Sequence, residues 1–336
     1  MAKVLVVGGG GFLGQALVKK LLERGDEVRS LSRGAYPQLE KMGVEVWRGD
    51  ITQRETALKA SAGCEAIYHT ASKAGVWGAY SEYERINIWG TRYLLEGCRQ
   101  NGIKKFIYTS TPSVIYHPQA KIENIQEDVA YPEKFECAYA QTKAQAEREV
   151  LQANSASLAT VALRPHLIYG PGDPHLVPRL VERAFAGQLF QVGDGKNRVD
   201  ITYIDNAAQA HIDAFLNMES CAGKAYFISD GQPVNLWDWV RELLAKVGTP
   251  PITSSIPYSL TWGLGAVSEL VYKLLGKKEE PKMTRFTAEQ LATSHYFNIA
   301  NAKRDLKYLP EVSVSEGMER LVAWIKEQGA DTLRHQ

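Results

Sequence analysis

The chain has 336 residues, of which 45% are apolar and 23% charged, so it is long enough to form a large globular core. Its 39 basic and 38 acidic side chains leave a formal charge of +1, which gives no net field toward polyanions, and we expect no nucleic-acid partner. The four cysteines form no CxxC pair and stand near no histidine at metal-ligand spacing, which predicts no metal, no disulfide framework and a reducing, cytoplasmic location.

Short apolar segments alternate with helical patterns in the first half of the chain. The expected strands are 3–7, 27–32, 44–50, 66–71, 105–110 and 159–165. The expected helices between them are 12–24, 83–101 and 138–154. Strands that are apolar at nearly every position are typical of a sheet buried on both faces. The alternation therefore predicts an α/β fold built on a doubly wound parallel sheet.

The pattern changes after residue 165, where proline and glycine cluster. Helices are expected at 177–186, 204–218, 236–247, 258–275 and 313–328, and one strand at 225–229. Ser313 and Glu316 have the spacing of a capping box, which marks the start of the last helix. We expect a smaller C-terminal substrate lobe made of 166–199 and 231–330, with 1–165 forming the main domain and 200–230 returning to it.

A glycine-rich loop joins the first strand to the first helix. Gly8, Gly11 and Gly14 in "VVGGGGFLGQALV" have the spacing GxxGxxG. Glycines there permit a tight turn and a close approach to a pyrophosphate, and the following helix offers free N–H groups to phosphate. The strand before the loop and the helix after it favour a Rossmann-type dinucleotide site over a glycine-rich turn with no ligand.

The end of the second strand indicates which dinucleotide binds. Enzymes that use NAD usually place an acidic residue there to hold the ribose hydroxyls, but this chain has Ser32 and Arg33. A guanidinium can pair with a 2′-phosphate through two hydrogen bonds, so the sequence predicts NADP(H) over NAD(H). The alternative is that Arg33 is only a solvated charge. Asp50, which ends the third strand, could accept a hydrogen bond from the adenine amino group.

Six motifs stand in an order that resembles the extended short-chain dehydrogenase/reductase superfamily over nearly the whole chain. They are "GGGGFLG" (8–14), "GDI" (49–51), "INIWGT" (86–91), "YTSTPSV" (108–114), "YAQTK" (139–143) and "LRPHLIYGPGD" (163–173). Within it, "AGVWG" (74–78), "LRPHLIYGPGDPHLVPRL" and "GDGKNRVDITYIDNAAQAH" are most similar to the branch of 3β-hydroxysteroid and sterol-4-carboxylate 3-dehydrogenases. Bacterial members of that branch include 2-alkyl-3-oxoalkanoate reductases, which use NADPH.

The resemblance implies a set of site residues. The cofactor would contact Gly8, Gly11, Phe12, Leu13, Gly14, Ser32, Arg33, Asp50, Ile51, Thr70, Ala71, Ser72, Tyr139, Lys143 and Pro165. The catalytic residues would be Tyr139, Lys143, Thr111 and Asn87, and the substrate would contact Trp77, Thr111, His166, Arg179 and Trp262. The chain departs from the family at Val7, where threonine is usual, and at Thr111, where serine is usual. Ser110 and Ser113 are the alternatives to Thr111.

The spacing of Tyr139 and Lys143 suits proton transfer. Hydride reduction of a ketone leaves an alkoxide that needs a proton, and a free tyrosine with a pKa near ~10 is a poor donor at neutral pH. Lys143 lies one helical turn from Tyr139, so its charge would favour the phenolate. Thr111 would donate a hydrogen bond to the substrate oxygen. Taken alone, the YxxxK pattern is common on ordinary helices, and Asn87 could equally cap or pack a helix.

The sequence leaves the substrate open. Trp77 and the 258–275 helix, which is apolar on more than one side, favour an apolar substrate of 2-alkyl-3-oxoalkanoate or 3-ketosteroid type. That helix is expected to be a core helix, a lid, or a peripheral contact with a membrane or a partner. Arg179, Arg183 and Arg198 would instead suit the diphosphate of a nucleotide sugar, as in an epimerase of the same superfamily. A non-catalytic NADP sensor is the alternative from another class. The superfamily resemblance implies a homodimer.

Overall fold

The computed structural model describes residues 1–116, 122–174 and 176–328, and a seven-stranded sheet forms its centre. All neighbouring strands of this sheet are parallel. In spatial order they are β12 (Ala225–Ile228), β7 (Ala159–Pro165), β5 (Lys105–Thr109), β4 (Ala66–His69), β1 (Lys3–Val7), β2 (Glu27–Ser32) and β3 (Glu45–Arg48). The strand order reverses direction between β1 and β4, and a ligand crevice is expected at the carboxyl ends of strands at such a point. The predicted doubly wound parallel sheet is confirmed.

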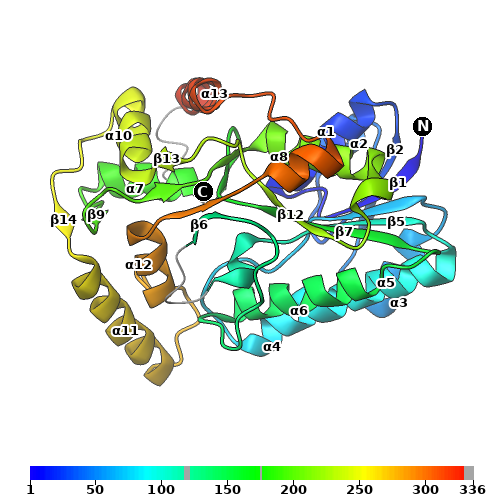
Figure 1. Cartoon of the computed structure of the whole chain (residues 1–336), viewed down its shortest axis with the longest axis horizontal. Coiled ribbons are helices and arrows are strands. Elements are labelled where there is room, and N and C mark those ends of the chain that lie inside the picture. Colours follow the sequence, from blue (N-terminus) through cyan, green and yellow to red (C-terminus); the bar gives the residue numbers. More distant parts are fainter. Residues whose placement is uncertain (117–121, 175, 329–336) are drawn as a thin grey trace.

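Helices cover both faces of this sheet (Figure 1). One face carries α3 (Arg54–Ser61), α5 (Gly90–Asn101) and α6 (Ala138–Gln152), and the other carries α1 (Phe12–Glu23) and α8 (Ile204–Leu216). Successive residues of β1 alternate between the two cores, with Leu5 and Val7 in one and Val4 and Val6 in the other. This two-residue period explains why β1 is apolar at four consecutive positions.

The helix expected at 83–101 is divided. It comprises α4 (Tyr80–Tyr83), a π-helical segment η1 (Glu84–Trp89) and then α5. Hydrophobic periodicity does not separate a wide π turn from an α turn, so the sequence predicted one continuous helix. The wider turn carries Asn87, a candidate catalytic residue. Single π turns of this kind recur at functional sites.

Three small sheets were not predicted. The strands of the first are β13 (Val234–Asn235), β10 (Arg198–Val199), β15 (His295–Phe297) and β6 (Ile122–Ile125); the other two pair β8 (Ile168–Tyr169) with β11 (Thr202–Tyr203) and β9 (Gln191–Val192) with β14 (Ser255–Ile256). Each strand is too short for a periodic pattern to appear. The four-stranded sheet joins β6, from the first half of the chain, to three strands of the second half. Conversely, β12 and α8 from 200–230 lie on the large sheet.

The remaining helices lie mostly in the second half of the chain. They are α2 (Pro37–Lys41), η2 (Pro112–Ile115), α7 (Leu176–Phe185), α9 (Met218–Cys221), α10 (Leu236–Val247), α11 (Tyr258–Leu274), α12 (Arg285–Ala292), η3 (Ala302–Leu306) and α13 (Val314–Gln328). The Ser313 hydroxyl accepts a hydrogen bond from the Glu316 N–H at 3.2 Å, as the capping box predicts, but the Glu316 carboxylate binds Arg320. No helix within the described ranges combines the length and apolarity needed to cross a bilayer.

Of the alternatives for the helix at 258–275, the core helix is excluded. α11 buries only Thr261 and Gly265, and its large apolar side chains face outward. Hydrophobic spacing gives the same pattern whichever way the apolar face points, so the sequence could not distinguish these cases.

Candidate active site

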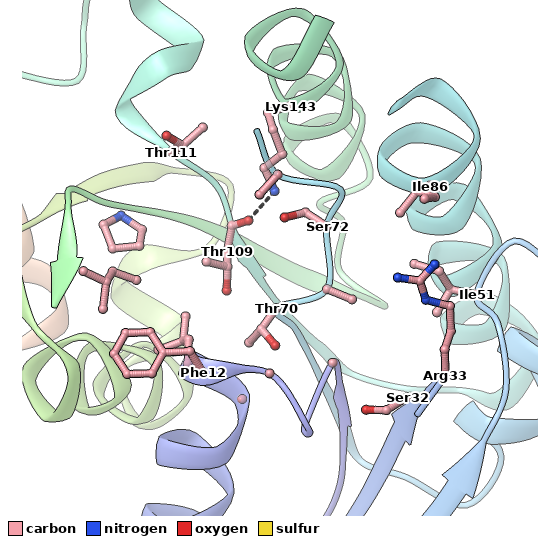
Figure 2. A pocket seen from close by; sticks show the side chains of 18 of the residues that line it. Phe12, Ser32, Arg33, Ile51, Thr70, Ser72, Ile86, Thr109, Thr111 and Lys143 are labelled. Carbon is pink, nitrogen blue, oxygen red and sulfur yellow. Dashed lines mark hydrogen bonds between the residues drawn. The ribbon is translucent and has the colours of Figure 1, made fainter. Parts of the chain in front are cut away.

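A cavity of about 610 Å³ opens at the carboxyl ends of β1, β2, β4 and β5. Every residue predicted to contact the cofactor lines it, and so does Thr111. Figure 2 shows Arg33 and Ile51 at one end of this cavity and Thr111 at the other, with Lys143 reaching toward Thr109 between them. The phosphate-binding motif and the YxxxK motif, which are far apart in sequence, therefore share one cavity.

The glycine loop has the backbone geometry that a phosphate cradle needs. Gly8 has φ of +88°, a left-handed conformation that side chains rarely allow. A Cβ atom on Gly14 would lie 2.0 Å from the Gly8 carbonyl oxygen, so only glycine lets α1 start so close to β1. No side chain caps the N-terminus of α1 at Gly11, which leaves backbone N–H groups directed at the cavity. These features fit a dinucleotide pyrophosphate.

The second strand ends in the residues that would meet the adenosine ribose. The Ser32 hydroxyl accepts a hydrogen bond from the Gly10 N–H at 3.1 Å, so Ser32 holds the glycine loop and retains its own proton for a ligand. Arg33 is exposed at the rim of the cavity. Asp50 accepts the Thr52 N–H at 2.9 Å, and the second carboxylate oxygen remains available at the cavity wall. Arg33 forms no ion pair with any described residue, so its guanidinium can pair with an anion.

Lys143 occupies a buried position beside the cavity. Its ammonium donates a hydrogen bond to the Thr109 carbonyl oxygen at 2.5 Å and lies 4.1 Å from the centre of the Tyr108 ring. Burial lowers the pKa of Lys143 to about 7, and the Glu147 carboxylate opposes that shift. The Thr109 hydroxyl bonds to His211 on α8 at 2.7 Å, so a helix from the second half of the chain fixes the lysine's partner.

Tyr139 and two hydroxyl residues stand at the same end. Burial raises the pKa of Tyr139 to about 12, and a hydrogen bond with Thr111 partly opposes this rise. The Thr111 hydroxyl also bonds to Ser113 at 3.2 Å, and Thr111 caps η2. Ser110 lines the cavity with a buried hydroxyl that has no protein partner in the described structure. Because an unmet buried hydroxyl is costly, a bound ligand is the natural partner for Ser110.

A buried ion pair between Glu147 and Arg164 lies next to Lys143 along α6. Glu147, one turn after Lys143 on α6, receives hydrogen bonds from Arg164 on β7, the shortest at 2.6 Å, and from the Tyr131 hydroxyl at 2.6 Å. The side chains of Glu147 and Arg164 are 0% and 3% exposed, so each charge depends on the other. No sequence pattern had marked this pair as part of the site.

Asn87 does not line the cavity, but its side chain forms hydrogen bonds with two segments that do: the loop after β4 and helix α6. Its amide oxygen accepts the Lys73 N–H at 2.7 Å, and its amide nitrogen donates to the Lys73 carbonyl at 3.2 Å and to the Thr142 hydroxyl at 3.1 Å. Thr142 sits between Tyr139 and Lys143 on α6. The side chain therefore ties the loop after β4 to the helix that carries both residues.

Four predicted substrate residues do not line the cavity. Trp77 donates to the Lys277 carbonyl oxygen at 3.1 Å, and the buried His166 bonds to His295 at 2.7 Å. Arg179 pairs with Glu280 at 3.7 Å, and Trp262 lies on the outside of α11 under the Arg285 guanidinium. The structure brings Thr111, but none of these four, to the cavity wall.

Several lining residues escaped the sequence analysis. They are Leu31, Gly34, Tyr36, Gly49, Ala74, Ile86, Thr109, Leu167, Ile168, Asp173 and Leu176. A signal was present for Asp173, which ends the "GPGD" motif: its carboxylate accepts the Leu176 and Val177 N–H groups at the start of α7. The apolar members stand in loops, at the ends of strands, in η1 (Ile86) or at the start of α7 (Leu176), where no periodic pattern distinguishes a cavity wall from a core.

Comparison with known proteins decides the family. The model of the "3-beta hydroxysteroid dehydrogenase/isomerase family" matches residues 5–258. The chain belongs to this family. It is therefore an oxidoreductase of the extended short-chain dehydrogenase/reductase type, as the motifs predicted.

Relatives of this 3-beta hydroxysteroid dehydrogenase/isomerase family member match nearly full length. It is 50% identical over 325 residues to "2-alkyl-3-oxoalkanoate reductase" of Stenotrophomonas maltophilia, covering 96% of this chain and 98% of the relative. It is 33% identical over 328 residues to the mouse "Sterol-4-alpha-carboxylate 3-dehydrogenase, decarboxylating", covering 95% and 90%. Among solved structures, a UDP-glucose 4-epimerase from Thermotoga maritima aligns with a TM-score of 0.76 at 24% identity, covering 97% and 99%, which shows a shared fold.

Proposed function

We propose that the chain interconverts a 3-oxo and a 3-hydroxy group on an apolar substrate, using NADP(H). The observation that carries this proposal is the cavity itself, which has the glycine loop and Arg33 at one end and Tyr139, Lys143 and Thr111 at the other. In sheets of this type a dinucleotide lies across the carboxyl ends of the strands, and its reactive ring would lie beside the tyrosine.

The residues fit the cofactor in physical terms. The glycine loop and the N-terminus of α1 would hold the pyrophosphate, Arg33 and Ser32 the 2′-phosphate end, and Lys143 the nicotinamide ribose. Val7 replaces the usual threonine, and the Thr70 hydroxyl bonds the Val7 carbonyl oxygen at 2.9 Å, which holds that turn by another route. When bound, the cofactor supplies or accepts the hydride.

The proton that the reduced substrate oxygen needs would come from the protein's own side chains. The Tyr139 hydroxyl would donate its proton to the substrate oxygen as negative charge develops there, and Thr111 or Ser110 would donate a hydrogen bond to the same oxygen. Burial raises the pKa of Tyr139 to about 12, so the phenol is protonated before reduction but is a weaker acid than a free tyrosine and depends on a nearby positive charge to release its proton. The Lys143 ammonium would stabilise the phenolate that remains. We assign Asn87 a positioning role through Thr142.

Two observations support an apolar carbonyl substrate. Ala74, Ile86, Leu167, Ile168 and Leu176 line the cavity beside the polar groups. The relatives named as 2-alkyl-3-oxoalkanoate reductases match at 50% and 45% identity over nearly the whole chain. We therefore propose a 2-alkyl-3-oxoalkanoate, or a 3-ketosteroid of similar apolar character. For the epimerase alternative, Arg179 and Arg183 would have to leave Glu280 and the Lys282 carbonyl to reach a diphosphate.

The test compares substrates directly. We expect NADPH oxidation with 2-alkyl-3-oxo acids, weaker oxidation with 3-ketosteroids and none with UDP-sugars. Epimerisation of a UDP-sugar without net cofactor turnover would overturn the substrate assignment. Cofactor binding without turnover on any of these carbonyls would favour the sensor alternative.

The cofactor preference has its own prediction. Arg33→Ala should weaken NADPH binding by about tenfold or more, the usual worth of a charge-assisted hydrogen bond, and leave NADH binding nearly unchanged. Arg48→Ala is the matched control, because Arg48 contacts the Arg33 carbonyl oxygen but does not line the cavity. Fluorescence titration measures both affinities. Tighter binding of NADH by the unaltered protein would contradict the assignment.

We also propose a cytoplasmic homodimer in which 1–165 with 200–230 binds the cofactor and 166–199 with 231–330 binds the substrate. Exposed Trp89 and Tyr80 beside α5 support a contact between copies on that face of the sheet.

A further inference from the structure

The helix α11 is turned with its apolar face to the outside. Its inner face consists of small and polar residues: Thr261 and Gly265 are buried, and a Cβ on Gly265 would lie 2.7 Å from the Thr284 carbonyl carbon. Its outer face carries the side chains of Leu260, Trp262, Leu264, Val267, Leu270, Val271, Leu274 and, just past its end, Leu275, each at least 40% exposed. Figure 1 shows α11 at the margin of the molecule, with α12 on its inner side.

The exposed stripe is continuous and uncharged. Leu260, Leu264, Val267, Val271 and Leu274 recur at alternating steps of four and three residues, so they form one seam along the helix. Residues 258–268 contain no charged side chain. Single exposed apolar residues are ordinary on a protein surface, but a seam of this length indicates a surface that another apolar phase covers.

A basic cluster adjoins one end of the stripe. Lys273, Lys277, Lys278 and Lys282 are all exposed. Of the nearby carboxylates, Glu269 pairs with Arg285 at 2.7 Å and Glu280 pairs with Arg179 at 3.7 Å, while Glu279 is exposed among the lysines. One exposed carboxylate beside four lysines leaves this end of the stripe positively charged. An apolar stripe beside a cluster of lysines complements an anionic bilayer surface, with headgroups against the lysines and acyl chains against the stripe.

A second copy of the chain fits this surface less well. A helix of 17 residues is about 25 Å long and about 10 Å wide, which gives a strip of roughly 250 Å². A stable protein interface needs about 800 Å² from each partner. The flanks of the seam also lack the paired acidic and basic residues that fix the register of a coiled coil: they carry Leu270, Leu275 and Lys277.

The stripe is connected to the mouth of the active site. Past the end of α11, the Lys277 carbonyl oxygen accepts a hydrogen bond from the indole N–H of Trp77, and the Trp77 ring packs edge-on against the Tyr272 ring. Trp77 belongs to the loop after β4, whose residues Ser72 and Ala74 line the cavity. A surface that touches α11 therefore lies next to the loop that borders the substrate site.

We propose that α11 is a peripheral docking helix for an anionic lipid surface, which delivers the apolar substrate to the cavity past Trp77. This inference rests on the proposed function only for the role of delivery, because docking itself needs no catalysis. The Val267, Val271 and Leu274 side chains enter the acyl boundary, and the four lysines contact acidic headgroups.

Vesicle flotation tests the docking. The protein should float with phosphatidylcholine vesicles that contain phosphatidylglycerol and bind them several-fold more weakly when the acidic lipid is omitted or the salt is raised. Val267→Asp/Leu274→Asp should reduce partitioning by about tenfold or more. Lys277→Gln/Lys278→Gln should reduce it by about fivefold per lysine on acidic vesicles. Leu216→Asp/Leu309→Asp, which alters exposed leucines outside α11, is the matched control and should float normally.

The outcomes separate docking from catalysis. Turnover of a water-soluble short-chain 3-oxo acid should be equal in all these variants, so loss of that activity in the unaltered protein would count against the proposed function and not against docking. Absence of flotation with acidic vesicles would overturn the docking proposal. Light scattering that shows a dimer, converted to monomer only by the α11 substitutions, would identify the stripe as a contact between copies and also overturn it.

Discussion

Tyr139→Phe should lower kcat by about 10²-fold or more while the protein keeps its fold and its affinity for NADPH. The substitution removes one hydroxyl, which in the proposed reaction is the only group that transfers a proton to the substrate oxygen. The measurement is steady-state NADPH oxidation with a 2-alkyl-3-oxo acid, together with circular dichroism and cofactor titration. Tyr226→Phe is the matched control: it removes a buried hydroxyl that bonds Asp305 away from the cavity, and kcat should stay within about twofold.

The pH dependence gives a second readout of the same step. Burial lowers the pKa of Lys143 to about 7, so the ammonium is charged below that pH and loses its proton above it. Since the charge assists Tyr139, kcat/KM for ketone reduction should fall as pH rises through about 7. The phenol itself, with a pKa near 12, stays protonated across this range. Near-normal turnover by Tyr139→Phe would mean that α6 carries the tyrosine for another purpose.

Arg164→Met should destabilise the fold by about 3–5 kcal/mol, because it leaves the Glu147 carboxylate buried without its partner. Urea unfolding followed by tryptophan fluorescence measures the change. Glu147→Gln/Arg164→Met removes both charges and should recover most of the lost stability, since replacing a whole buried pair is far less costly than breaking it. Equal stability of the single and double variants would show that Glu147 is accommodated without Arg164.

The sequence predicted the half of the site that depends on backbone geometry. Segments 3–7, 27–32 and 159–165 match β1, β2 and β7 to the residue, because short segments that are buried along nearly their whole length leave a clear pattern. Gly8 and Gly14 were recognised because few other residues allow that turn. Their positions at the cavity follow from the topology alone: the carboxyl ends of parallel strands meet at one edge.

The remaining features depend on contacts between distant residues, which single-sequence patterns do not record. Nothing adjacent in sequence links Glu147 to Arg164, or Thr109 to His211. Tyr36 packs against Gly10 only because β2 and the glycine loop are neighbours in space. The direction of the apolar face of α11 was left open for a different reason: the periodicity of apolar residues reports their spacing and not which side the protein covers.

The position of β12 at the edge of the large sheet bears on how the protein could be dissected. Residues 225–228 pair with β7 along four positions, and α8 packs against α1, so the second half of the chain completes the layer that the first half begins. A truncation at residue 165 would leave β7 as an open edge able to pair with other chains, and would uncover the apolar side of α1. A minimal fragment that keeps the large sheet whole would therefore have to splice 200–230 onto 1–165.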